Sequence, residues 1–308
     1  MKVLVTGGAG FVGSHLIEEL LSNGESVVCL DDFSTGKRKN LEHIKDKITI
    51  IEGDIRNPEI VKTALQNVEQ VYHLAAQISV TNSVRNPLID ATININGFIT
   101  LLNAIQKSSV KRIVYVSTGG AIYGEPENIP APETTSEEPI SPYGLSKLVG
   151  EKYLRWFNRT YGLSYSIIRP ANIYGPRQDP LGEAGVISIF LGKIHENQPV
   201  EIFGDGFDTR DYVFVKDIAK MCLLAMNSEN NDTYNAGTTI RTSLLELISI
   251  IEEETTTTTL KKFGPPRPGD VKHISLDIEK AKNALSWIPQ THLNEGIRKT
   301  WEWYQSTH

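Results

Sequence analysis

The stretch Val3–Gly13, which reads VLVTGGAGFVG, decides the fold class of this 308-residue chain. An apolar, β-branched run leads through a glycine-rich turn into Phe11–Ser22, where apolar residues recur at helical spacing. A strand, a glycine turn and a helix in this order are typical of a dinucleotide-binding unit. In such a unit Gly10 lets the backbone approach a diphosphate and Gly13 lets the helix pack closely on the strand, while the helix N-terminus stabilises the negative charge.

A second apolar run, Ser26–Asp31, ends in an aspartate at roughly the twenty-residue spacing that the ribose-binding acid has in these units. The Asp31 carboxylate can accept hydrogen bonds from both hydroxyls of an adenosine ribose, and its charge repels a 2′-phosphate. The pattern therefore predicts NAD as the cofactor rather than NADP. The alternative is a purely structural turn followed by a solvated acid.

The first half of the chain continues to alternate short apolar runs with helical segments. Near-continuous apolar strands separated by helices indicate a parallel sheet covered on both faces, so the fold class expected is a doubly wound, Rossmann-type α/β fold. The expected strands are Val3–Thr6, Ser26–Asp31, Ile48–Gly53, Gln70–Ala75, Arg112–Thr118 and Ser164–Arg169, and the expected helices are Phe11–Ser22, Pro58–Gln66, Asn94–Lys107 and Pro142–Tyr161.

After Arg169 the sequence pattern changes, and glycine, proline and asparagine separate short secondary-structure elements. We predict an NAD-binding domain over residues 1–169, to which the chain returns around 210–235. Residues 170–308 are predicted to form mainly a smaller lobe at the carboxyl edge of the sheet, where open α/β sheets bind ligands. The run Thr255–Thr259 is expected to be an edge strand or an irregular connection.

Composition excludes several classes of protein. With 31 Lys and Arg against 37 Asp and Glu the net charge is −6, which disfavours binding to nucleic acid. Cys29 and Cys222 lie far apart in apolar surroundings, as free thiols do in a reducing compartment. The seven histidines show no ligand spacing, so no metal is expected. Strand-like sequence begins at Lys2, which leaves no room for a signal peptide, and no apolar run approaches the ~20 residues of a membrane helix. A cytoplasmic protein without a membrane partner is expected.

A candidate catalytic group lies near the middle of the chain. Tyr143 and Lys147 are four residues apart and so share one face of the expected helix, and Thr118 ends the fifth expected strand. A phenol with a pKa near 10 is a poor base at pH 7, but a neighbouring ammonium ion and the positive ring of NAD lower that pKa. The three residues together predict acid–base chemistry beside the cofactor, whereas the tyrosine–lysine pair alone is also typical of an exposed helix surface.

Two weaker signals extend the predicted cofactor site. Asp54 and Ile55 follow the third strand, where an acid can meet the adenine amino group or equally cap the next helix. The segment Leu74–Gln77 ends the fourth strand with small residues that leave space for the nicotinamide.

Further motifs follow in order along the chain. They are Ser117–Gly124 (STGGAIYG), Ser141–Gly144 (SPYG), Arg169–Asn172 (RPAN), Arg210–Val213 (RDYV) and Arg267–Asp270 (RPGD). With them the chain resembles the extended short-chain dehydrogenases/reductases, within these the NAD-dependent epimerase/dehydratase family, and most of all the short bacterial and archaeal UDP-glucose 4-epimerases. The resemblance extends from Val3 almost to the C-terminus.

The resemblance implies a set of residues that hold NAD, from the glycine turn, the segment after the second strand, the ends of the third and fourth strands and the catalytic helix. These are Gly7, Gly10, Phe11, Val12, Gly13, Asp31, Asp32, Phe33, Ser34, Thr35, Gly36, Asp54, Ile55, Leu74, Ala75, Ala76, Gln77, Tyr143 and Lys147.

It also implies catalytic roles. Tyr143 would take the proton of the sugar 4-hydroxyl. Lys147 would lower the tyrosine pKa and hold the nicotinamide ribose. Thr118 would hydrogen-bond the sugar oxygen O4, and the family often has a serine there.

For the substrate, the resemblance implies a nucleotide diphosphate held by Asn172 and clamped by Arg210 and Arg267, because guanidinium groups match phosphate oxygens. The segment Val200–Phe203 would carry the pyrimidine, and Asp270 would bind the nucleotide ribose. The other implied substrate-binding residues are Thr118, Gly185, Val186, Glu201, Phe203 and Ile274. Without the resemblance, Arg210-Asp211 is equally typical of a local ion pair and Arg267–Asp270 of a rigid turn.

The reaction implied is that of an isomerase, which epimerises a UDP-hexose (UDP-glucose or UDP-galactose) at C4 through a transient 4-keto sugar, with NAD as hydride store. Dehydratases carry an Asp-Glu pair after the hydroxyl residue, where this chain has Gly119 and Gly120, which cannot move protons. A UDP-glucuronate 4-epimerase, another nucleotide-sugar enzyme such as a decarboxylase, and a non-catalytic NAD-binding regulator stay open as alternatives. Ile274 stands where some relatives have a bulky tyrosine, so acceptance of N-acetylated UDP-sugars is also predicted.

By the same resemblance a homodimer is expected, formed by the helices about Asn94–Lys107 and Pro142–Tyr161. Apolar side chains on these helices suit either an interface or the core of the subunit. They are Ile99, Leu102, Ile105, Leu148, Tyr153 and Trp156.

Overall fold

A seven-stranded parallel sheet forms the centre of the computed structural model, which describes residues 1–180, 185–266 and 271–307. The strand order is β11-β6-β5-β4-β1-β2-β3, and neighbouring strands pair in parallel. The predicted doubly wound sheet is therefore confirmed. The strands are β1 (Lys2–Thr6), β2 (Ser26–Asp31), β3 (Thr49–Glu52), β4 (Gln70–His73), β5 (Arg112–Val116), β6 (Ser164–Pro170) and β11 (Asp232–Ala236).

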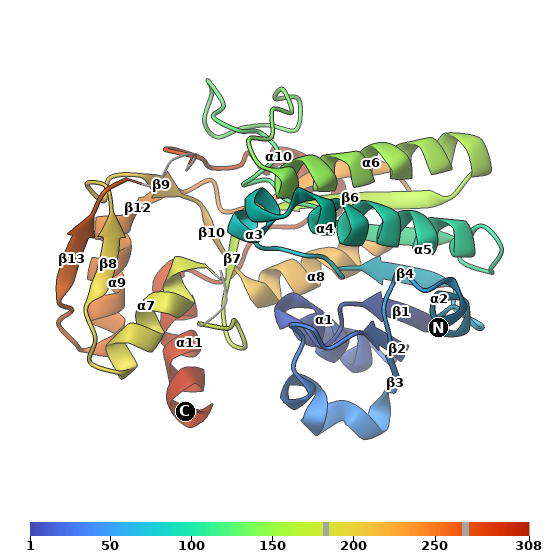
Figure 1. Ribbon diagram of the computed structural model, residues 1–308, viewed down its shortest axis with the longest axis horizontal. Helices are drawn as coiled ribbons and strands as arrows, with labels where there is room; N and C mark the ends of the chain where they lie inside the picture. Colours follow the sequence, from blue (N-terminus) through green and yellow to red (C-terminus); the bar gives the residue numbers. More distant parts are fainter. Residues whose placement is uncertain (181–184, 267–270, 308) are drawn as a thin grey trace.

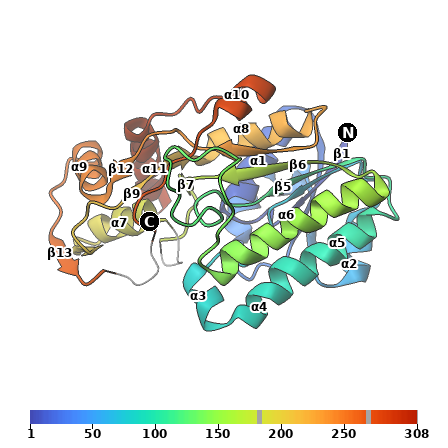
Figure 2. The same cartoon turned by 90° about the horizontal axis from the view of Figure 1, so that it is seen from above.

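Helices cover both faces of this sheet (Figures 1 and 2). One face packs against α2 (Pro58–Ala64), α5 (Gly97–Ile105) and α6 (Pro142–Tyr161), and the other against α1 (Phe11–Ser22) and α8 (Val215–Met226). Alternation along the strands explains the two layers, because Leu4 points into the first core while Val3 and Val5 point into the second. Two of the expected helices, α1 and α6, have the predicted bounds.

The helix expected over Asn94–Lys107 begins earlier than predicted. It runs from Pro87 through α4 (Pro87–Ala91), the π-helical turn η2 (Thr92–Asn96) and α5. Asn86 caps it, since its side chain accepts a hydrogen bond from the Ile89 N–H at 3.2 Å, and proline at the first position favours a helix start.

The longer helix also corrects the expectation that no apolar run approaches membrane-spanning length. Residues 87–105 form a helix of 19 residues with a mean hydropathy of 1.4, long and apolar enough to cross a membrane by length and composition alone. In the fold this helix packs against α2 and α6, and Asp90 and Asn94 within it are buried. About 39% of this apolar window is buried within the subunit.

The chain returns to the sheet twice after residue 170. Residues 212–236 supply β10 (Tyr212–Phe214), α8 and β11, and α8 packs beside α1. A second return was not foreseen from the sequence. Ile278, α10 (Glu279–Leu285) and Trp287 pack into the core that α1 and α8 form with the sheet. The Trp287 indole donates a hydrogen bond to the Asp217 carbonyl at 3.0 Å.

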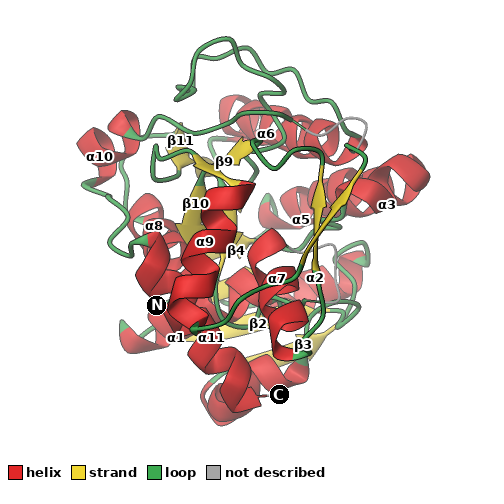
Figure 3. Ribbon diagram, turned by 90° about the vertical axis from the view of Figure 1, so that its left-hand side faces the viewer, coloured by secondary structure: helices red, strands yellow, loops and turns green. Residues whose placement is uncertain are grey.

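A smaller lobe with its own core lies beside the sheet, at the left in Figure 1 and toward the viewer in Figure 3. It contains α7 (Val186–His195), β8 (Val200–Phe203), α9 (Leu244–Thr255), β13 (Lys261–Gly264) and α11 (Leu293–Thr307), with β8 and β13 paired in parallel. Three further short strands, β7 (Asn172–Tyr174), β9 (Thr209–Arg210) and β12 (Thr242–Ser243), complete two small pairs, β7 with β10 and β9 with β12. Of the run Thr255–Thr259, Thr255 is the last residue of α9, and the other threonines form an irregular connection, one of the two expected forms, in which Glu252 accepts hydrogen bonds from Thr259.

Candidate active site

A cavity of about 530 Å³ opens where the carboxyl edge of the sheet faces the smaller lobe. The sheet side supplies residues from the ends of β5 and β6 and from α6, and the lobe supplies residues from α7, β8 and β9. Ligand pockets in enzymes commonly have this size and position. Eight of the residues singled out from the sequence line it: Thr118, Tyr143, Asn172, Gly185, Val186, Glu201, Phe203 and Arg210.

Tyr143, Lys147 and Thr118 meet at the end of β5. The helix that carries the first two begins at Pro142, where the Ser141 hydroxyl accepts a hydrogen bond from the Gly144 N–H at 3.2 Å. The Thr118 hydroxyl lies within reach of the Tyr143 phenol and lowers the pKa of this phenol. The Lys147 ammonium is buried and donates to the Val116 carbonyl at 2.8 Å. A phenol, an ammonium ion and a hydroxyl are therefore held together beside the cavity.

Burial determines the pKa values of the two ionisable groups. It raises the pKa of Tyr143 to about 12, while the Thr118 hydroxyl lowers it and the charge of Asp90 raises it. Burial lowers the pKa of Lys147 to about 8, against the opposing charges of Asp90 and Glu151. In the chain itself burial is the main influence on the Tyr143 pKa, and the group that lowers this pKa is Thr118 rather than the expected Lys147. A cation bound next to the phenol, such as a nicotinamide ring, would favour the phenolate.

The glycine turn between β1 and α1 fits a dinucleotide diphosphate. Gly7 adopts the left-handed region with φ 71°, and a Cβ there would lie 2.7 Å from the Ala75 nitrogen. Gly10 occupies the N-cap position of α1, and the first turn after it reads Phe-Val-Gly-Ser, so neither a capping side chain nor a carboxylate competes for the N–H groups. A diphosphate satisfies such groups and is stabilised by the helix dipole.

Asp31 lies at the end of β2 with 7 % of its surface exposed, next to this turn. Its carboxylate accepts hydrogen bonds from the N–H groups of Ala9 at 2.8 Å and Phe33 at 2.9 Å. Burial raises the pKa of this carboxyl, and the two backbone hydrogen bonds lower it. Asp31 therefore connects the glycine turn to the loop after β2. In this loop Gly36 packs against the Asp31 carboxylate, and the Asp32 carboxylate accepts hydrogen bonds from the N–H and hydroxyl groups of Ser34.

Replacing Asp31 by asparagine is expected to weaken NAD binding about 10- to 100-fold, because hydrogen bonds to a charged acceptor are worth roughly 1.5–3 kcal/mol together. The change also removes the charge that repels a 2′-phosphate, so the preference for NAD over NADP should shrink. Protein from which bound NAD has been removed is titrated with NAD and with NADP, and tryptophan fluorescence reports the binding of each, which measures both effects. Asp46→Asn, an exposed acid on η1 (Arg38–Lys47), is the control. Unchanged affinity in Asp31→Asn would contradict the assignment.

The two weaker cofactor signals have different surroundings. The Asp54 carboxylate pairs with the Arg56 guanidinium and accepts a hydrogen bond from the Arg56 backbone N–H at 2.8 Å. The cap of α2 is Asn57, so Asp54 does not cap that helix.

Gln77 is held by two residues that sequence reasoning missed. Its N–H donates to Asn94 at 2.8 Å and its amide to Asp90 at 2.9 Å.

These two missed residues form a buried polar group that packs against α6. Asn94 also donates to the Ser146 hydroxyl on α6 at 3.0 Å, so the group links Gln77 to the helix of Tyr143. The sequence signal was present, since Asp90 and Asn94 are polar residues four apart and therefore share one face of the helix.

The lobe side of the cavity carries the groups expected to meet the substrate. Asn172 begins β7 and its N–H donates to the Asp211 carbonyl at 3.0 Å. Arg210 donates to the carbonyls of Thr209 at 3.0 Å and Lys272 at 3.2 Å. The Asp211 carboxylate instead accepts from Thr238, which disfavours the reading of Arg210-Asp211 as a local ion pair. Arg267 and Asp270 lie outside the described residues.

Ile274 is placed differently from the expectation. It is 2 % exposed and packs in a hydrophobic cluster with Ile122, Leu148 and Leu276, and among the described residues it does not line the cavity. The lining residue of this segment is Val271, which belongs to the same cluster. The effect of Ile274 on sugar selection stays a prediction. Such an effect would be indirect, because Ile274 would have to change the packing of this cluster and thereby the position of Val271.

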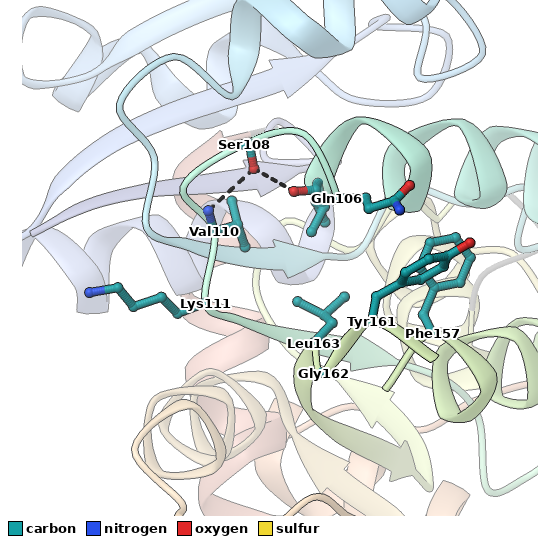
Figure 4. Close-up of a pocket in the computed structure, with 9 residues that line it drawn as sticks. Gln106, Ser108, Val110, Lys111, Phe157, Tyr161, Gly162 and Leu163 are labelled. Atoms are coloured by element: carbon teal, nitrogen blue, oxygen red, sulfur yellow. Dashed lines mark hydrogen bonds between the residues drawn. The ribbon is translucent and has the colours of Figure 1, made fainter. Parts of the chain in front are cut away.

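A second cavity, of about 280 Å³, lies at the opposite edge of the sheet (Figure 4). It is lined by residues that precede β5 and β6 and by the ends of α5 and α6. The Ser108 hydroxyl there donates to the Ile105 carbonyl and accepts from the Val110 N–H. Because ligands of open α/β sheets bind at the carboxyl edge, the larger cavity is the candidate active site.

The chain is similar to proteins of one family. The sequence model of the NAD dependent epimerase/dehydratase family matches residues 3–237. The UDP-glucose 4-epimerase of Mycolicibacterium smegmatis is 42% identical over 310 residues, 99% of each chain.

Three solved structures share the fold. That of UDP-glucose 4-epimerase with UDP-glucose from Thermotoga maritima has a TM-score of 0.97 and 44% identity over 100% of this chain and 99% of the other. UDP-N-acetylglucosamine 4-epimerase from Methanobrevibacter ruminantium has a TM-score of 0.95 and 34% identity over 100% and 99%. UDP-glucuronic acid 4-epimerase from Bacillus cereus, with UDP-glucuronic acid and NAD, has a TM-score of 0.93 and 31% identity over 100% of both chains.

Proposed function

Since the chain belongs to the NAD-dependent epimerase/dehydratase family, we propose that it is an isomerase that interconverts UDP-glucose and UDP-galactose by inverting C4. One observation carries the proposal: Tyr143 and Thr118, with Lys147 beside them, border a cavity whose other wall is the smaller lobe. A nucleotide sugar bound along this cavity can place its sugar at the phenol and its nucleotide in the lobe.

NAD, when bound, stores the hydride from C4 and returns it. Tyr143 takes the proton of the 4-hydroxyl and later gives it back, while Thr118 holds the oxygen O4 by a hydrogen bond. The Lys147 ammonium, fixed by the Val116 carbonyl, stabilises the phenolate form of Tyr143. Between the two proton transfers the 4-keto sugar must present its other face, and the small residues Gly120 and Ala121 leave room beside it.

Dehydratase chemistry is disfavoured by the backbone that follows Thr118. An added Cβ at Gly119 would lie 2.5 Å from Leu276 Cδ1 and 3.1 Å from the Arg169 carbonyl oxygen, so an acidic side chain there would require Leu276 and the backbone to shift. Gly120 borders the cavity but brings no acid. Two other substrates deserve a direct test, UDP-N-acetylglucosamine and UDP-glucuronate, because epimerases of both share the fold.

The function is tested by incubating the purified protein with UDP-galactose, without added NAD, and following the anomeric signals by NMR. Conversion to a stable mixture of UDP-galactose and UDP-glucose is expected. UDP-N-acetylglucosamine and UDP-glucuronate in parallel samples rank the alternatives. Failure with UDP-galactose even after NAD is supplied would reject this substrate, and failure with all three would favour a non-catalytic NAD-binding role.

We further propose a homodimer built on α3 (Val80–Arg85), α4 and α6. Large apolar side chains are exposed on the outer surface of these helices, and α6 packs beside both α3 and α4. They are Val84, Leu88 and Ile89 with Leu145, Tyr153, Trp156 and Tyr161. Of the residues that suit either an interface or the core, Leu102, Ile105 and Leu148 are buried within the subunit because their side of each helix faces the cores.

The double change Leu88→Glu with Trp156→Glu is expected to yield monomers, because burying two charges in an apolar interface costs several kcal/mol. Light scattering after gel filtration measures the mass of each form. Ile240→Glu, an exposed apolar residue in the loop between β11 and β12, should leave the dimer intact. A dimer that survives the double change would place the interface elsewhere.

We also propose that the protein acts in the cytoplasm, in galactose metabolism, where its substrate would be a nucleotide sugar. The two cysteines support this proposal, since both are buried as free thiols.

A further inference from the structure

Three successive side chains on one face of α6 contact the end of β5. Tyr143 lies within reach of Thr118, Lys147 donates to the carbonyl of Val116 at 2.8 Å, and Glu151 accepts from the hydroxyl of Ser117 at 2.7 Å. The three helix residues are spaced by four and therefore lie above one another along the helix. The catalytic mechanism uses the first two contacts, and the third has no assigned role.

Glu151 is fully buried, with 0 % of its surface exposed, and four donors surround its carboxylate. One oxygen accepts from Ser117 Oγ and from Arg169 Nε at 2.9 Å. The other accepts from Arg169 Nη2 at 2.7 Å and Arg155 Nη2 at 2.8 Å. A carboxylate offers about four acceptor positions, so each one is used and the orientation of the side chain is determined.

The partner Arg169 extends the connection to the end of β6. Its guanidinium is 1 % exposed, donates to the Tyr123 hydroxyl at 2.9 Å and pairs with Glu137. The backbone N–H groups of Ser117 and Gly119 donate to the carbonyls of Ile168 and Pro170 at 2.8 Å each. Glu151 therefore joins α6 to both strands whose ends border the cavity.

We propose that Glu151 is a positioning residue for the reaction of the proposed function. Through Ser117 it holds the end of β5 in register with α6, so that the Thr118 hydroxyl and the Tyr143 phenol stay within reach of each other. The inference rests on the proposed function for its activity readout, but the contacts themselves are independent of which UDP-sugar is the substrate.

Ser117→Ala gives the cleanest test. It removes the link between Glu151 and the strand while leaving the ion pairs of Glu151 intact. We expect kcat for UDP-galactose to fall about 10- to 100-fold with KM and NAD content unchanged, because misplacement of a catalytic group by about 1 Å has effects of this size. Ser166→Ala is the control, a buried hydroxyl on β6 that donates to the Ala225 carbonyl and accepts from the Arg112 guanidinium, without a hydrogen bond to the described residues of α6. It should lower the melting temperature but keep kcat.

Glu151→Gln completes a double-mutant cycle with Ser117→Ala. If Glu151 acts through Ser117, the double variant should lose no more kcat than Glu151→Gln alone. Glu137→Gln, which removes a carboxylate from the same arginine without touching Ser117, should keep kcat. A Ser117→Ala protein that loses only melting temperature, as Ser166→Ala does, would overturn the proposal. A wild-type protein inactive on every UDP-sugar would instead reject the proposed function.

Discussion

Tyr143→Phe is expected to lower kcat for UDP-galactose by about 10²- to 10⁴-fold, the usual contribution of a positioned acid–base group. The ring of phenylalanine fills the same space, and Lys147 keeps its bond to the Val116 carbonyl, so the fold and the site walls stay in place. What is lost is the hydroxyl that lies within reach of Thr118 and carries the proton. KM should change little, because most of the cavity wall that meets the nucleotide belongs to the lobe.

The decisive readouts are kcat from NMR progress curves and NAD content from the absorbance of the deproteinised sample. Tyr153→Phe is the control, since Tyr153 lies on the same helix but is exposed. If Tyr143→Phe keeps more than about a tenth of the wild-type kcat, another group is the base. If it loses NAD as well as activity, Tyr143 serves mainly to bind the cofactor.

Gly13→Ala is expected to prevent stable folding or to expel NAD altogether. An added Cβ would lie 2.2 Å from the Gly7 carbonyl oxygen and 2.8 Å from Gly8 Cα, both backbone atoms that cannot rotate away. Overpacking of this kind commonly costs about 1–3 kcal/mol and here the obstacle is rigid, so a loss at or above about 3 kcal/mol is expected. Urea unfolding and the yield of soluble protein measure it.

Gly10→Ala separates the packing role of the turn from its binding role. Its Cβ would meet only the Gly7 carbonyl oxygen, at 3.1 Å, and would otherwise face the N-terminus of α1 where the diphosphate is expected. This variant should fold with nearly wild-type stability but be isolated with little NAD. Normal NAD content in Gly10→Ala would place the diphosphate elsewhere, and normal stability in Gly13→Ala would contradict the close packing of α1 on β1.

Signals that depend on near neighbours in the chain were readable from the sequence. The bounds of α1 and α6, the glycine turn, and the four-residue spacing of Tyr143 and Lys147 follow from helical periodicity and turn chemistry, which act over a few residues. The start of the helix at Pro87 had a local signal too, in Asn86-Pro87. It was missed because Asp90 and Asn94 interrupt the apolar periodicity.

The sequence by itself determined the parallel α/β architecture, and it predicted an NAD-binding turn with its acid at Asp31 and the residue types of a catalytic group. Only the tertiary structure decided that Asp90 and Asn94 hold Gln77, that Glu151 reaches Ser117, and that Ile274 lies in a hydrophobic cluster beside the cavity wall. It also decided the direction of the pKa shift of Tyr143, which burial raises. The reason is physical. The burial of a side chain and the pairing of a buried charge depend on side chains that distant segments of the chain bring together. The spacing of residues along one segment does not show which distant side chains will be its neighbours.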